Sequence, residues 1–169
     1  MNLSGVDKLK AKLGGIKSRI ANPEPGLKRA AMVVLKAAKE HIKSGGPGWA
    51  PNQTGTPLLF QSGRLINSLQ LGADGNDTEL RGNTIYTGTN VPYAKFLQEG
   101  TGVFGPSGTP IRPKNGRALA FEVNGKMVFA KSVKGSPARP FLYIDDHVAQ
   151  VVNQVYKRYI MGASDADLW

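Results

Sequence analysis

The chain has no cysteine in 169 residues, which excludes disulfides and thiolate metal sites. Histidine is almost as scarce. Neither His41 nor His147 has a second histidine or a carboxylate at the i, i+4 spacing that a helical metal site requires. We interpret both as surface or boundary residues, and we expect neither a metal nor a cofactor.

Long hydrophobic runs are also lacking. No stretch approaches the ~18 apolar residues that a membrane span needs. The first twenty residues carry lysines throughout and have no apolar segment of signal-peptide length. These features predict an intracellular protein with no membrane partner.

Motifs for catalysis are missing too. There is no nucleophile elbow and no dinucleotide fingerprint. The stretch "GVFGPSGTP" lacks the lysine and the strand–loop–helix setting of a phosphate loop. Asp145 and Asp146 are accounted for by the dipole of the helix that they precede. We therefore predict that the chain is not an enzyme. The competing hypothesis is a hydrolase whose carboxylate site is assembled from scattered residues such as Glu99 and Asp146.

Positive charge, glycine and proline are what the chain has in abundance. The net charge is +10, and residues 1–44 hold ten bases against three acids, whereas residues 141–169 hold two bases against four acids. This polarity suits contact with nucleic acid, head-to-tail packing of identical subunits, or simply a solvated basic face. The 21 glycines and 11 prolines predict long ordered loops at 45–61 and 100–117, the first of them held to the body by Trp49 and by Leu58, Leu59 and Phe60.

Apolar periodicity predicts three long helices. The first covers residues 4–21, where Gly14 and Gly15 weaken it by roughly 1 kcal/mol each. The second runs from Gly26 to about Ser44, and the third from about 144 to 161. Two short helices are expected at 62–69, with Ser62 as N-cap, and at 92–100, where the aromatic side must be docked because so short a helix is marginal alone.

Strand signals are weak at 68–74 and 78–82 and better at 83–89. The clearest is the hairpin around Asn124 and Gly125. There Leu119, Phe121 and Val123 share one face with the residues opposite them, and Met127 and Phe129 fall on the other. We expect both faces of this hairpin to be at least partly covered.

The order of elements predicts an α+β fold, with an antiparallel or mixed sheet on which N-terminal and C-terminal helices pack. A single domain spans residues 1–169. It comprises a basic helical part (1–44), a region of sheet, loops and last helix (45–161), and a polar tail (162–169).

The segment "SPARPFLYIDD" is a stiff arm before the last helix. Pro137 and Pro140 fix an extended path, and the backbone of Arg139 is held extended because a proline follows it. The Arg139 guanidinium suits a carboxylate on Glu99, on Glu122 or on a neighbouring subunit, or it satisfies local backbone carbonyls. Apolar residues of the arm should anchor the last helix: Phe141, Leu142 and Ile144.

Four stretches, in order, carry a resemblance to a known family: "GWAPNQTGTPLLFQSGRLINSL", "IYTGTNVPYAKFLQEGTG", "RALAFEVNGKMVFAKSV" and "SPARPFLYIDD". Together they resemble the tail-completion and neck proteins of tailed bacteriophages. These are the phage virion morphogenesis family and the related HK97 gene-10-like tail components. The resemblance covers residues from about 47 to 150. The N-terminal helices match only in kind, and residues 162–169 do not match.

This resemblance implies a structural virion protein, assembled in the host cytoplasm. Such a protein forms a homo-oligomeric ring, a hexamer being favoured, at the head-proximal end of the tail or in the neck. It completes the tail and permits head–tail joining around the DNA channel. The implied partners are further copies, neighbouring connector and tail proteins (tail terminator, tube or sheath), and the passing DNA. The subunit-interface candidates are Tyr93, Lys95, Glu99, Thr101, Arg139 and Phe141.

The alternative function is a sequence-independent DNA-binding module built on the basic N-terminal helices. Contacts to phosphate carry no sequence information and weaken with salt, so a row of cations is sufficient for that role. The candidates that would face DNA are Lys8, Lys10, Lys12, Lys17 and Arg19.

Overall fold

A computed structural model describes residues 4–49, 62–123 and 125–163. Within these ranges, helices combine with two small antiparallel sheets, which confirms the predicted α+β class. The helices are α1 (Gly5–Ala21), α2 (Glu24–Ser44), α3 (Arg64–Ser68), α4 (Ala94–Glu99) and α5 (Asp146–Met161), with a 3-10 turn η1 (Gly102–Phe104). The strands are β1 (Asn76–Arg81), β2 (Thr84–Thr89), β3 (Leu119–Val123) and β4 (Lys126–Ala130). Most of the predicted loop at 45–61, including Leu58, Leu59 and Phe60, lies outside the described residues, as does most of the tail; Trp49 packs against the core.

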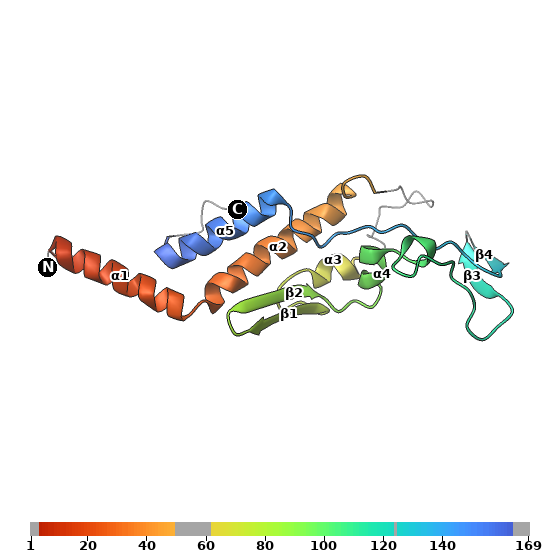
Figure 1. Ribbon diagram of the computed structural model, residues 1–169, viewed down its shortest axis with the longest axis horizontal. Helices are drawn as coiled ribbons and strands as arrows, with labels where there is room; N and C mark the ends of the chain where they lie inside the picture. Colours follow the sequence, from red (N-terminus) through yellow and green to blue (C-terminus); the bar gives the residue numbers. More distant parts are fainter. Residues whose placement is uncertain (1–3, 50–61, 124, 164–169) are drawn as a thin grey trace.

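Helices α2 and α5 lie side by side and form the centre of the molecule (Figure 1). Helix α2 begins at Glu24, two residues earlier than predicted, because Pro25 is tolerated in a first helical turn. Helix α5 begins where expected, since the Asp145 carboxylate caps it by accepting from the backbone N–H of Val148 at 2.7 Å. The two helices approach closely at Gly26, where a Cβ atom would collide with the ring of Tyr159.

The core has two adjoining parts. In the larger part, α2 packs against α3 and the start of α4, with the Phe141 side chain only 2% exposed among them. In the smaller part, α2 packs against α5 through valines, and Leu142 contacts both parts. The arm therefore does anchor the body, as predicted, through Phe141 and Leu142. The expectation for Ile144 is wrong, because its side chain is 60% exposed.

Strands β1 and β2 pair in antiparallel register, Asn76 opposite Thr89 and Arg81 opposite Thr84, and lie against α2 (Figure 1). The predicted strand at 68–74 is wrong. Those residues end α3 and then turn, with glycines at positive φ (Gly72, 75°; Gly75, 79°) that end any regular structure.

Both short helices form, but with two corrections. Gly63, in the left-handed region, takes the N-cap position of helix α3 in place of Ser62, whose hydroxyl still accepts from the backbone N–H of Arg64 at 3.4 Å. Helix α4 does not dock its aromatic side: Phe96 is 59% exposed and Tyr93 is 38% exposed. Instead Ala94 and Leu97 contact the core, and α4 is held at its C-terminal end by the arm.

Candidate functional site

The arm pairs along its length with the loop that follows α4, which brings together two of the stretches that carry the family resemblance. The backbone N–H of Thr101 donates to the Ser136 carbonyl at 2.9 Å, and the Ser136 N–H donates to the Thr101 hydroxyl at 2.8 Å. The Val103 N–H donates to the Lys134 carbonyl at 2.8 Å, and the Arg139 N–H donates to the Leu97 carbonyl at 2.7 Å. The loop and the arm thus form one irregular ladder.

Glycines permit this close backbone approach. Gly102 (φ 64°) and Gly135 (φ 90°) adopt conformations that L side chains rarely adopt. A Cβ atom at Gly102 would collide with the Lys134 carbonyl, and one at Gly135 with the Thr101 carbonyl. The glycines of this region are therefore required by packing as well as by φ.

Gln98 fixes the end of the arm, and the sequence reasoning missed it. Its side-chain oxygen accepts from the backbone N–H groups of Phe141 and Leu142, each at 3.1 Å, and its side-chain nitrogen donates to the Leu142 carbonyl at 3.0 Å. His41 adds a further contact, because its Nδ1 donates to the Phe141 carbonyl at 3.0 Å while its ring stacks on Tyr143. No periodicity or spacing marks a glutamine for such a role.

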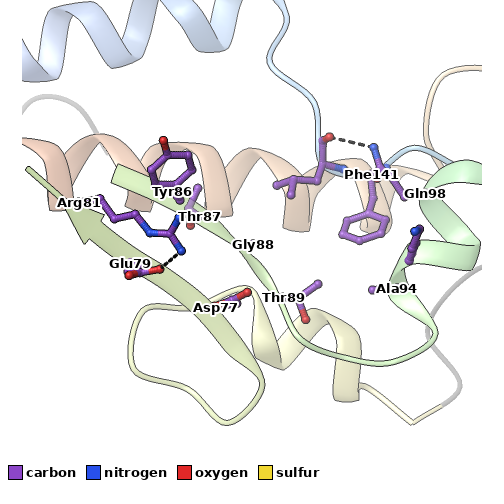
Figure 2. Close-up of a pocket in the computed structure, with 12 residues that line it drawn as sticks. Asp77, Glu79, Arg81, Tyr86, Thr87, Gly88, Thr89, Ala94, Gln98 and Phe141 are labelled. Carbon is purple, nitrogen blue, oxygen red and sulfur yellow. Dashed lines mark hydrogen bonds and ion pairs between the residues drawn. The ribbon is translucent and has the colours of Figure 1, made fainter. Parts of the chain in front are cut away.

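A cavity of about 340 Å³ opens beside Gln98, over the outer face of β1 and β2 (Figure 2). Glu79 and Arg81 point into it from β1 and pair at 2.6 Å. The Arg81 hydrogen bond lowers the pKa of Glu79, and Glu79 raises the pKa of Arg81. The pair therefore keeps both groups charged at neutral pH. That suits recognition of another charged surface rather than proton transfer.

The six interface candidates do not converge on one spot. Thr101, Arg139 and Phe141 belong to the ladder between loop and arm, and Arg139 makes a further interaction besides its backbone hydrogen bond to Leu97. Tyr93, at the N-cap of α4, and Lys95 and Glu99, on α4 itself, are exposed, and Lys95 lines the cavity of Figure 2. Phe141 lies in the core of the subunit. The identity of the Arg139 partner and the role of these residues between subunits stay predictions.

Helix α1 projects from one end of the molecule (Figure 1) and has no buried residue. Its apolar stripe is open: Val6, Leu9, Leu13 and Ile20 are 56–61% exposed. The described part of the chain anchors α1 at its C-terminal end, where the Arg19 Nε donates to the Ile160 carbonyl at 2.8 Å. Four of the five DNA-facing candidates are exposed on this helix: Lys8, Lys10, Lys12 and Lys17.

The hairpin of β3 and β4 lies at the opposite end (Figure 1). Its register is as predicted, with Val123 opposite Lys126, although Asn124 itself lies outside the described residues. The expectation that both faces are at least partly covered holds for the face of Phe121 and Val128 but not for the face of Met127 and Phe129. Phe129 is 70% and Met127 is 60% exposed on one face, and Phe121 and Val128 are each 37% exposed on the other. The hairpin extends beyond the helical body, so neither face is closed by the core of its own subunit.

Nearly all of the net charge lies in α1 and in the segment 103–135, which contains the hairpin and the loops on either side of it. Residues 4–21 hold five bases and one acid, and residues 103–135 hold six bases and one acid. The rest of the chain is close to neutral and holds ten of the twelve acids. Helix α1 is therefore basic as well as apolar, whereas the bases of residues 103–135 lie mostly in the loops beside the hairpin, since β3 and β4 hold one acid, Glu122, and one base, Lys126.

Comparisons with known proteins identify no relative: no protein-family model, no curated protein and no solved structure matches the chain. Within the described residues, two further kinds of feature are absent. No helix in these ranges is long and apolar enough to cross a membrane, and none of their His, Asp and Glu side chains gather in a group of three that could hold a metal.

Proposed function

We propose that the chain is a structural subunit of a homo-oligomeric ring in a tailed-phage virion, where it completes the head-proximal end of the tail and permits head–tail joining. The observation that carries the proposal is the pair of uncovered apolar elements, α1 and the β3–β4 hairpin, at opposite ends of the molecule. The ordered stretches that resemble tail-completion and neck proteins supply the virion context.

The exposed hairpin argues for a partner. A two-stranded hairpin is at best marginally stable alone in water and needs further strands or a helix against it. Here both faces carry large apolar side chains, among them Phe129 and Met127. Exposed apolar patches of this kind mark interaction sites. The hairpin therefore gains its missing cover on assembly.

A ring follows from where the two elements lie. A contact between different patches of identical subunits is heterologous, and it produces a closed ring when the rotation between subunits closes. Helix α1 and the β3–β4 hairpin lie at opposite ends of the molecule, so they are different patches and meet the condition for a heterologous contact. Like charge disfavours contact between α1 and the segment 103–135 that carries the hairpin, because both are basic, and it leaves the nearly neutral body of a neighbour as the surface that each would meet.

Two experiments test the proposal: the first measures the oligomeric state of the purified protein, and the second examines phage particles that lack it. Light scattering and sedimentation should detect a defined oligomer whose population grows with concentration, and electron microscopy should resolve a ring. A phage that encodes the chain but lacks its product should accumulate filled heads and unjoined tails. A chain that stays monomeric at high concentration, or normal virions without it, would refute the proposal.

The second candidate is the DNA-binding module, favoured by the four exposed lysines of α1. Removal of residues 4–21 should then lower DNA affinity and reduce its salt dependence, since each phosphate contact adds to the salt slope. Unchanged affinity would exclude this role for α1. Arg19 is the weakest of the five candidates, because its Nε is already bound to the Ile160 carbonyl.

A further inference from the structure

We infer that α1 of one copy docks in the groove between α2 and α5 of a second copy. The inference rests on the proposed assembly and adds to it the identity of the two surfaces that meet. The 17 residues of α1 span about 25 Å at the rise of an α-helix. At 100° per residue, Lys10 and Lys17 flank the apolar stripe on one side and Lys12 flanks it on the other.

The receiving groove runs between two antiparallel helices. Its apolar walls are Val33 and Ala37 from α2 and Val148 and Val151 from α5, and it encloses about 310 Å³. Two adjacent helices present ridges and a groove into which a third amphipathic helix packs. The apolar stripe of α1 provides such a helix.

Charge favours this groove over the others. Its rim carries the carboxylates of Glu40 and Asp145 and one lysine, Lys36. Glu40 also pairs with Lys43 at 3.0 Å, but both side chains are more than half exposed, and surface pairs of this kind are weak enough to exchange partners. The groove beside Leu69 is lined by two lysines and no carboxylate, and the cavity of Figure 2 balances its two carboxylates with two cations. The trough between α2 and β2 has no charged lining residue. A stripe flanked by lysines is therefore best complemented by the groove between α2 and α5.

Position supports the same pairing. The groove lies at the C-terminal half of α2, whereas α1 joins the N-terminal end of α2 and is tied to the far end of α5 through Arg19. An α1 helix held at that end projects away from the groove of its own subunit (Figure 1). The donor and the acceptor of the contact thus face different neighbours, as a heterologous ring requires.

Engineered cysteines test the inference cleanly, because the chain has none of its own. Leu13→Cys and Ala37→Cys are placed on separate molecules of the full chain, which are mixed and mildly oxidised. A disulfide between the two variants is the expected result. The matched controls combine Leu13→Cys with Tyr86→Cys, in the trough between α2 and β2, or with Met127→Cys on the hairpin. Both controls lie at more exposed positions than Ala37.

The outcomes separate this inference from the proposed function. A predominant cross-link to Ala37→Cys supports the docking. Equal or stronger cross-linking to a control position, or no cross-link in a sample that still forms the oligomer, overturns the docking and leaves the ring intact. A sample that stays monomeric overturns both.

Charge reversal supplies a second, independent measurement. Lys10→Glu should weaken the association by placing like charges together, and Glu40→Lys in the same chain should restore it. If Lys10 instead contacted DNA, Glu40→Lys would not restore what Lys10→Glu had weakened. Loss of association without rescue would therefore count against the groove as the docking site.

Discussion

Replacing Leu9 and Leu13 of α1 by glutamine should separate assembly from folding. Glutamine has nearly the helix propensity of leucine, so the helix itself is preserved. The two side chains are 57% and 56% exposed in the single chain, and burying the remainder of each against a partner is worth about 1–1.5 kcal/mol. The pair thus contributes about 2–3 kcal/mol to docking, which corresponds to an association about 30- to 150-fold weaker in the variant.

The same variant should fold almost normally. Helix α1 has no buried residue, and substitutions at exposed positions usually change the free energy of unfolding by less than about 0.5 kcal/mol each. Sedimentation across a concentration series measures the dissociation constant, and thermal unfolding of dilute protein measures stability. The matched control is Leu35→Ala in the core, 2% exposed, which should cost about 2–5 kcal/mol of stability.

Two results would refute this reasoning. If the double variant associates as tightly as the parent chain, the stripe of α1 is not a docking surface. If the double variant loses several kcal/mol of stability even as a monomer, α1 belongs to the fold of its own subunit. Either result would also remove the main support for docking in the groove between α2 and α5.

Three further predictions concern the body. Gln98→Leu should lower the free energy of unfolding by about 2–3 kcal/mol in a denaturant titration, because it leaves backbone groups of the arm without their partner. Gly102→Ala should cost about 1–3 kcal/mol more than Gly72→Ala, since φ is positive at both positions but only the Cβ at Gly102 would meet backbone; equal losses would contradict the packing argument. NMR titration should place the pKa of Glu79 below its ordinary value, and Arg81→Gln should raise it. Because the folded-state pKa is lowered, the stabilisation from this pair is present above the ordinary pKa of Glu79 and is lost as pH falls through the folded value.

Much of the local structure could be predicted because it depends on short-range spacing. The three long helices follow from apolar residues at steps of three and four, and the pairing of Val123 with Lys126 follows from the two-residue turn. The placement of Asp145 and Asp146 at the start of α5 follows from the acids that precede its apolar pattern, and the α+β class follows from the order of the elements. Two local predictions were wrong because a nearby glycine favours a different conformation. Gly72 and Gly75 form turns where a weak pattern predicted a strand, and Gly63 takes the N-cap position expected for Ser62.

Coverage of apolar surface could not be predicted, because it depends on which elements meet in space. Sequence alone indicated that Phe129, Phe96 and Ile144 are apolar, and we expected the fold to cover them. Only the tertiary structure decided that these side chains face outward while Phe141 lies in the core. The clamp by Gln98 is likewise tertiary, since its partners are more than forty residues away.

The sequence by itself determined where charge and hydrophobicity occur along the chain: a basic amphipathic start, an apolar hairpin between basic loops, and ten of the twelve acids outside these segments. These patterns depend only on residues close together in the sequence, so they can be recognised before the fold is known. The tertiary structure decided that α1 and the hairpin end up at opposite ends of one body, with their apolar faces open and the groove between α2 and α5 at a distance from its own α1. Long-range packing sets that arrangement, because the contact of α2 with α5 joins residues more than a hundred positions apart.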